Sequence, residues 1–273
     1  MVFLLTLKPK KECNKSKLIL RYDTDREEGN LIGSKKLTTS LNKQFKSTSG
    51  LVYSGDTLCI GIQSLINEND YIAFFDCYSE NCKIFKCNFS KNIGNIISLF
   101  PGKLYLDSYD INSIVSISFD HVNFLFFDDS LYYNIKDSKI KSLCNYKNNW
   151  FLAIQNKNKI IDLSNNRTVF SDIEDPCSLF FNDNHRLCFI EKGRDLFHCG
   201  DKIFKVNKNP TTAIKDHYIN GYWIVCGTDL LLIDYYTGNI IVKKDLSNWG
   251  IEFNNIVEAK GRFYETNFKN HEN

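Results

Sequence analysis

The feature that most constrains this chain is a recurrence of short β-rich runs with almost no helical periodicity. Runs such as Asp70–Asp76 and Gly221–Gly227 combine aromatic and branched residues and alternate with polar turns. The turns use Asn, Asp, Ser and Gly, residues that tolerate turn dihedrals or hydrogen-bond their own backbone. Examples lie at 164–166, 182–184, 219–221 and 237–238. The chain is therefore predicted to be all-β.

The runs also recur as a larger unit. Each unit begins with a small or polar residue and an apolar stretch, which a polar turn follows. An aromatic-rich strand comes next, then a strand that often ends in Asp, and an edge strand ends the unit. The unit starts are placed near Thr48, Ile111, Ser142, Cys177, Thr211 and Phe253. Four-stranded propeller blades repeat about every 40 residues, so the pattern predicts a six-bladed β-propeller rather than a large β-sandwich. The long first gap contains residues 96–106, interpreted as an inserted loop or part of a blade.

The final unit is incomplete at the C-terminus, and Lys17–Asp23 near the N-terminus is predicted to supply what it lacks. Pairing N-terminal and C-terminal strands in one blade removes exposed sheet edges. Residues 1–16 are interpreted as a basic leader, because lysines crowd this segment, and 17–268 as a single propeller domain.

Charge and cysteine content limit the function classes. The net charge is +2, from 34 Lys+Arg against 32 Asp+Glu, and this balance argues against nucleic acid as a partner. No apolar window approaches the roughly 18 residues of a membrane-spanning helix. The first residues make a poor signal peptide, so the ten cysteines are expected to be reduced, mostly as small buried hydrophobic residues of a cytoplasmic protein.

Compact catalytic signatures are missing from the sequence. It contains no Gly-x-Ser-x-Gly elbow, His-Glu-x-x-His pair, phosphate-binding glycine loop or EF-hand loop. Cys77, Cys82 and Cys87 are spaced five residues apart, but structural zinc sites commonly use Cys-x2-Cys pairs. We interpret these three cysteines as core or surface thiols, and we assign no catalytic residue.

Four segments resemble one protein family as a set. Residues 158–170 resemble a strand–turn–strand motif, 175–197 a Pro-led blade segment, 101–114 an Asp-rich segment, and 231–256 a closing blade. The family is a bacterial group of uncharacterised six-bladed β-propellers, distantly similar to NHL and gluconolactonase-type propellers. The resemblance covers roughly residues 48–260 and supports the fold more than any activity.

The resemblance also points to positions where ligands would bind. The family pattern carries histidines where this chain has Asn112 and Cys177, at positions expected to face the mouth of the central channel. Asn is a poor proton-transfer group, so the replacement favours binding over catalysis. Asp110, Asn112 and Asp175 could hold a divalent cation, as Glu, Asn and Asp do in gluconolactonase-type propellers; the alternative is that these residues cap turns. No other cofactor is expected.

Two further residues complete the candidate site. Cys177 is either a nucleophile facing the channel or a small buried residue. Arg194 either binds an anionic ligand through its guanidinium fork or forms a surface ion pair.

Two functions follow from these residues. The first is a non-catalytic propeller that binds a partner protein or a glycan-like ligand at one face of the central channel. The alternative is a metal-dependent hydrolase or isomerase acting on a sugar-like or lactone substrate.

Overall fold

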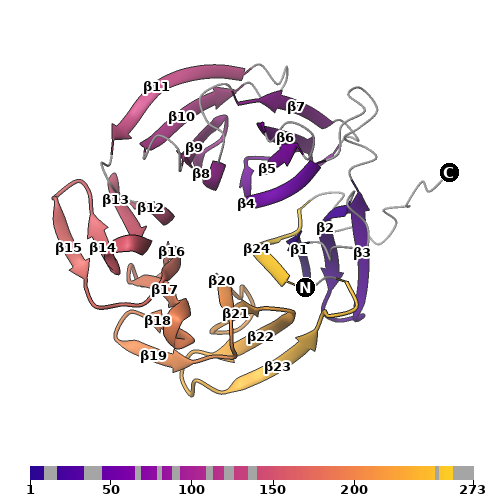
Figure 1. Cartoon of the computed structure of the whole chain (residues 1–273). Helices are drawn as coiled ribbons and strands as arrows, with labels where there is room; N and C mark the ends of the chain where they lie inside the picture. The colour runs from indigo at the N-terminus through magenta and orange to yellow at the C-terminus, as the bar shows by residue number, and fades with distance from the viewer. Residues whose placement is uncertain are drawn as a thin grey trace. The chain divides into compact units, whose positions relative to one another are not determined.

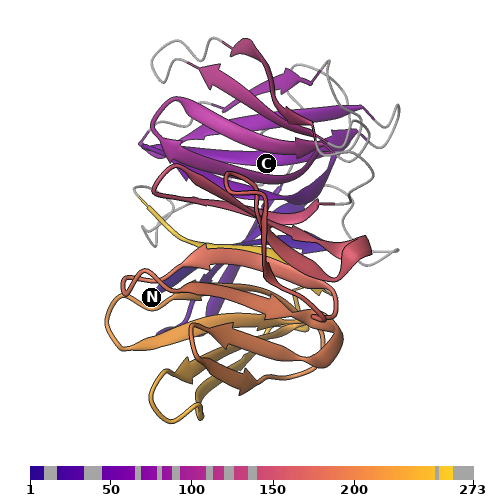
Figure 2. The same cartoon turned by 90° about the vertical axis from the view of Figure 1, so that its left-hand side faces the viewer.

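The predicted fold class, a six-bladed β-propeller, is confirmed: a computed structural model places the strands in six four-stranded antiparallel sheets (Figure 1). The structure describes residues 1–8, 17–33, 45–64, 69–78, 82–87, 93–108, 113–119, 126–134, 140–249 and 252–260. The chain divides into two compact units with three sheets each, and the strands of a sheet lie side by side in both views (Figures 1 and 2).

The first unit holds the N-terminal and C-terminal parts of the chain. One sheet has the order β24 (Glu252–Glu258), β1 (Val2–Lys8), β2 (Lys17–Asp23), β3 (Glu28–Gly33). The next comprises β4 (Phe45–Ser54), β5 (Thr57–Ser64), β6 (Asp70–Asp76) and β7 (Cys82–Lys86). The third comprises β8 (Ile93–Phe100), β9 (Lys103–Ser108), β10 (Ser113–Phe119) and β11 (Phe126–Asn134).

The second unit repeats the same meander three times. Its first sheet comprises β12 (Ile140–Tyr146), β13 (Asn149–Ile154), β14 (Lys159–Asp162) and β15 (Arg167–Phe170). Its second comprises β16 (Pro176–Phe181), β17 (Leu187–Glu191), β18 (Leu196–Cys199) and β19 (Lys202–Lys205). Its third comprises β20 (Pro210–Lys215), β21 (Gly221–Cys226), β22 (Asp229–Asp234) and β23 (Ile240–Asp245). Within this unit β16 contacts both β12 and β20.

The expected closure of one blade by N-terminal and C-terminal strands is confirmed, with one more strand than the sequence analysis supplied. β24 pairs with β1 in antiparallel register, with Leu5 opposite Ile256. β1 falls inside the segment interpreted as a leader, and it belongs to the sheet because Phe3, Leu4 and Leu5 are fully buried. Residues 9–16 of that segment lie outside the described residues.

The predicted start of the second unit is wrong. The blade begins with β8, whereas the predicted start at Ile111 comes just before β10, the third strand of the blade. Ile111 itself lies outside the described residues. Residues 96–106 are thus part of the blade, in β8 and β9. The sequence does not distinguish β8 from β10 as the start of the blade, because both strands contain a short run of Ile and Ser residues. The other five predicted starts lie in the first strands of their sheets.

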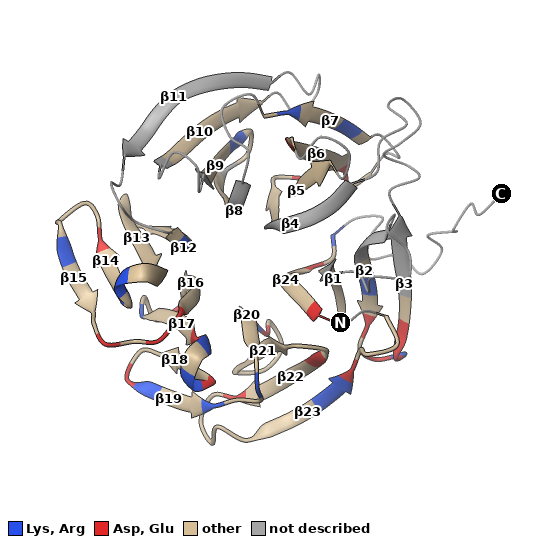
Figure 3. Cartoon of the chain, viewed as in Figure 1, with Lys and Arg blue, Asp and Glu red and all other residues tan. Residues whose placement is uncertain are grey.

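The blades pack through aromatic and branched side chains. In the second unit, Ile190, Phe197, Tyr222 and Ile224 belong to one buried cluster that joins the second and third sheets. Of the nine described cysteines, all but Cys82 are buried, as expected for small hydrophobic side chains. Lys, Arg, Asp and Glu are interspersed in both units (Figure 3). Among the described residues, no helix is long and apolar enough to cross a membrane.

Candidate functional site

Two neighbouring turns of the second unit border a pocket of about 290 Å³. One turn joins β16 to β17, and the other joins β20 to β21. Both turns were predicted from their Asn, Asp and Gly residues, at 182–184 and 219–221, but they were not predicted to form a site. Because they occupy the same position in successive repeats, the repeat places them side by side.

The first turn is fixed by its own backbone. Asn182 N donates to Arg186 O at 3.0 Å, and Arg186 N donates to the Asn182 side-chain Oδ1 at 3.0 Å. His185 closes the turn with a positive φ of 61°. Asp183 and Asn184 at the tip are thereby presented toward the pocket.

The second turn is organised by one buried carboxylate. Asp216 Oδ1 accepts from the backbone N of Tyr218 at 2.7 Å and of Ile219 at 2.8 Å. Its Oδ2 accepts from Trp223 Nε1 at 2.7 Å, which ties the turn to β21. The charge of Asp216 is therefore satisfied within the protein, and the turn holds the Tyr218 side chain exposed, at 78% of its full area.

Each charged side chain that lines the pocket has a partner within the protein. Lys215 Nζ forms a close ion pair with Asp183, and Asp216 accepts from neutral donors. Tyr235 is half-buried in the pocket wall, and the Lys202 ammonium lies over its ring, 4.3 Å from the ring centroid. The pocket thus offers amides, a hydroxyl and aromatic faces rather than an excess of one charge.

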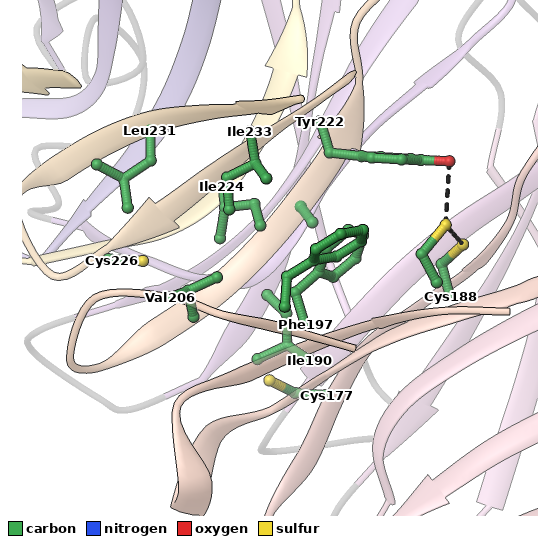
Figure 4. Close-up of a cluster of buried hydrophobic side chains, with 13 residues drawn as sticks. Cys177, Cys188, Ile190, Phe197, Val206, Tyr222, Ile224, Cys226, Leu231 and Ile233 are labelled. Carbon is green, nitrogen blue, oxygen red and sulfur yellow. Dashed lines mark hydrogen bonds between the residues drawn. The ribbon is translucent and has the colours of Figure 1, made fainter. Parts of the chain in front are cut away.

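Tyr222 links the pocket to two buried thiols. Its hydroxyl lies 3.2 Å from Cys199 Sγ, and Cys199 Sγ lies 3.1 Å from Cys188 Sγ (Figure 4). Asn182 Nδ2 also donates to Cys199 Sγ, at 3.4 Å. Tyr222 and Asn182 both line the pocket, so the thiol pair lies directly beneath its wall.

These contacts shift the proton affinities of the two thiols in opposite directions. The pKa of Cys199 is lowered, because the Cys188 thiol, the Tyr222 hydroxyl and the Asn182 amide all stabilise its thiolate. The pKa of Cys188 is raised, first because it donates to Cys199 and then because burial disfavours its charged form. Burial also raises the pKa of Tyr222, which keeps its hydroxyl protonated.

Those residues predicted from sequence that the structure describes lie away from the pocket. Asp110 and Asn112 fall outside the described residues. Asp175 and Cys177 lie at the start of β16, whereas the pocket lies at its far end. The Cys177 thiol donates to Thr211 O at 3.6 Å, and burial raises its pKa to about 12, which suits a packed thiol rather than a nucleophile.

Asp175 and Arg194 lie at the same end of their sheet, because Lys192 N donates to Asp175 O at 3.2 Å. Asp175 Oδ1 is 3.8 Å from Lys141 Nζ and has no hydrogen-bond partner. Arg194 contacts Glu191 Oε1 at 2.9 Å and Glu174 Oε1 at 3.4 Å. The guanidinium is thus engaged in ion pairs, the second of the two roles considered for it.

Glu191 is the centre of a buried polar network beside these residues. It is 1% exposed, and its Oε2 lies 2.8 Å from His198 Nε2. Its Oε1 accepts from Glu174 N at 2.9 Å as well as from Arg194. The His198 ring stacks on Phe189 with centroids 4.3 Å apart. Across the residues that the structure describes, no three His, Cys, Asp or Glu side chains gather as metal ligands.

Comparison with known proteins supports the fold. The chain is similar to a chain of the crystallised nidogen–laminin complex, with a TM-score of 0.71 and 11% identity over 96% of this chain and 100% of that one. A Lactobacillus plantarum protein gives 0.61 and 10% identity over 94% and 99% of the two chains. The periplasmic gluconolactonase of Pseudomonas aeruginosa gives 0.53 and 12% identity over 89% and 83%.

These neighbours agree with the class of protein that the six sheets define, a β-propeller of six blades. No family model matches the chain, and no curated protein is significantly similar to it in sequence. Identities this low extend to the fold alone, and the neighbours include both a binding assembly and an enzyme.

Proposed function

We propose that this chain is a non-catalytic propeller that binds a neutral, hydroxyl-rich ligand, glycan-like in its chemistry, in the pocket between the β16–β17 and β20–β21 turns. The observation that carries the proposal is the lining: fixed turns present amide and phenol groups, Lys215 pairs with Asp183, and the Asp216 carboxylate accepts from the Trp223 indole and from backbone N–H groups. A volume of about 290 Å³ is near the lower end of small-molecule sites and suits a single sugar-sized group.

Tyrosine is the side chain best suited to such a ligand here. Sugar rings present an apolar face with hydroxyls around the rim, and Tyr offers a flat apolar face with a polar tip. Tyr218 is exposed at the pocket edge and Tyr235 is half-buried in its wall. Asn184 and Asn220 supply donors and acceptors nearby. A partner protein is the other ligand class considered, but the pocket is small for one unless a single side chain enters it.

The test compares two exposed tyrosines. A ligand that binds only the folded state raises its unfolding temperature, so the chain is screened against neutral mono- and oligosaccharides by thermal unfolding. Tyr218→Ala should abolish the rise given by any sugar that binds. Tyr236→Ala, a similarly exposed tyrosine outside the pocket lining, should leave it unchanged. Equal loss in both variants, or no rise with any sugar, would contradict the proposal.

The metal-dependent alternative is tested in the same assay. The unfolding temperature is measured with chelator and then with added calcium, magnesium, manganese or zinc. A rise of several degrees with one metal would favour the hydrolase or isomerase and would justify a screen of lactone and sugar-acid substrates.

A further inference from the structure

Cys188 and Cys199 face each other across two paired strands. They are direct partners in the β17–β18 register. The adjacent backbone bond runs from Gly200 N to Leu187 O at 3.1 Å, which makes Leu187 and Gly200 a hydrogen-bonded pair and Cys188 and Cys199 the neighbouring non-hydrogen-bonded pair. The Cα atoms of such a pair lie about 4.5 Å apart, within the roughly 4.4–6.8 Å spanned by disulfides.

The two sulfurs already point at each other. Their separation is 3.1 Å, and Figure 4 shows this contact next to the contact with the Tyr222 hydroxyl. The S–S bond of a disulfide is about 2.0 Å long, so about 1 Å of side-chain movement would form one, with no strand displacement. Cys177, another cysteine of the same sheet, donates instead to a backbone carbonyl.

The surroundings give the two sulfurs different roles. Cys199 sulfur accepts from the Cys188 thiol and the Asn182 amide, and its own thiol donates to the Tyr222 hydroxyl. These polar partners make Cys199 the better thiolate, which is the reactive form of a cysteine. Cys188 keeps its proton and lies 3.1 Å from Cys199 Sγ, close enough to attack Cys199 once that sulfur has been oxidised. This division into an attacking and a resolving cysteine is the arrangement of redox-active thiol pairs.

We propose that Cys188 and Cys199 form a reversible disulfide beneath the pocket, and that the oxidant is a small peroxide such as hydrogen peroxide. The Cys199 thiolate attacks one peroxide oxygen, the O–O bond breaks, and a sulfenic acid and hydroxide form. Cys188 sulfur then attacks Cys199 sulfur, the S–O bond breaks, and the departing hydroxide takes the Cys188 proton as water. In total, two thiols lose two electrons to one peroxide and yield one disulfide and two waters.

Burial selects the oxidant. Both cysteines are 0% exposed, and the groups between Cys199 and the pocket are the Asn182 amide and the Tyr222 hydroxyl. A molecule of nearly the size of water can approach between two polar side chains. A bulky aromatic disulfide cannot. The site should therefore react with hydrogen peroxide while resisting Ellman's reagent.

Oxidation also alters the pocket wall. In the disulfide, Cys199 sulfur has no charge and no proton, so it holds the Tyr222 hydroxyl and Asn182 amide less strongly. Both groups line the pocket, and they become freer to bind a ligand there. This second consequence rests on the proposed function, whereas formation of the disulfide does not.

The experiment treats the folded, reduced full chain with hydrogen peroxide, blocks remaining thiols with an alkylating agent, and maps the peptides by mass spectrometry. The expected product is lighter by two hydrogen atoms, carries a Cys188–Cys199 link, and returns to the starting mass with dithiothreitol. Ellman's reagent should label neither cysteine until the protein is unfolded. Peroxide that leaves both cysteines reduced, or that links them to other partners, would overturn the proposal.

Two variants make the test specific. Cys188→Ser removes the resolving thiol, so Cys199 should stop at the sulfenic acid, which dimedone traps when the oxidised protein is unfolded in its presence. Cys226→Ser, a buried cysteine of the next sheet, should leave the link unchanged. If Cys188→Ser does not fold, the wild-type peptide map still decides the question. Sugar binding measured on both redox forms tests the proposed function separately, because its absence leaves the mass result intact.

Discussion

Glu191 is a buried carboxylate that provides a hydrogen-bond or ion-pair partner for several groups. It accepts from a backbone N, an Arg and a His, while only 1% of its area is exposed. Glu191→Ala leaves these donors facing an apolar gap, so we expect the free energy of unfolding to fall by about 3 kcal/mol. Urea denaturation with circular dichroism measures the change.

The matched control is Glu174→Ala. Its carboxylate also contacts Arg194, at 3.4 Å, but its side chain is half exposed. Exposed ion pairs contribute little, so this loss should stay under about 1 kcal/mol. Similar losses in the two variants would show that the network contributes no more than a surface ion pair.

The peroxide reaction of Cys199 should have a characteristic pH dependence. The pKa of Cys199 is lowered, because its hydrogen bonds with the Cys188, Tyr222 and Asn182 side chains and the nearby Arg186 guanidinium stabilise its thiolate. The thiolate therefore persists to lower pH, and the oxidation rate should be half-maximal well below the ordinary thiol pKa of about 8.5. The measurement is the rate of Cys199 oxidation by peroxide at a series of pH values, with the reaction quenched at set times. A midpoint at or above the ordinary thiol pKa would contradict the prediction.

Single residues were the hardest part to predict from sequence. Cys177 and Arg194 were singled out through a family resemblance, and the structure packs the first and ion-pairs the second. The sequence does not pair Cys188 with Cys199, because eleven positions separate them and no known motif connects them. Their pairing depends on strand register, which a count of cysteines does not contain.

At the level of elements, Gly221 shows how closely two strands approach. A Cβ added there would meet the Ile233 carbonyl oxygen at 2.6 Å, and this backbone atom cannot move aside alone. Gly221→Ala should therefore destabilise the fold by about 2 kcal/mol, through overpacking between β21 and β22. The measurement is the midpoint of urea denaturation.

Gly227, in the turn between β21 and β22, provides the comparison. Its φ is +62° and no atom lies within 4 Å of an added Cβ. Asn tolerates this conformation, so Gly227→Asn should cost less than about 1 kcal/mol. If it cost more than Gly221→Ala, backbone dihedral rather than strand packing would limit this hairpin.

The positions of the strands are predicted well from the sequence where the turns between them contain Asn, Asp, Ser or Gly. The turns at 164–166, 182–184 and 237–238 separate strands in the structure as expected. β1 and β8 are harder to recognise from the sequence. The apolar run of β1 is followed by lysines, and the run of β8 resembles that of β10. Their identity depends on which strand they pair with, and that information lies far away in the chain.

At the scale of the whole molecule, the β24–β1 pairing should be decisive for stability. A chain that ends at Trp249 lacks β24, including the buried Phe253 and Ile256, and leaves one edge of β1 unpaired. We expect the unfolding temperature to fall by at least about 10 °C and the protein to aggregate. A chain that ends at Lys260 keeps β24 and is the control. Equal unfolding temperatures would show that the pairing contributes little.

The repeat made the architecture predictable, whereas the ligand was not. Six similar units, each with polar turns, limit the topology to few choices. The pocket arises where two of those turns meet, and its chemistry depends on which side chains the turns hold outward. The repeat places the turns together, but it does not specify the exposed side chains that a ligand would contact.

The pairing of β1 with β24 also sets an order of events during synthesis. β1 leaves the ribosome first among the described strands and β24 last, so β1 pairs early with β2 while its other edge has no partner. Until translation reaches residue 258, this nascent sheet exposes a template for pairing with another chain. The vulnerable period for this protein is therefore its own translation, and slow elongation or a stalled ribosome would prolong it.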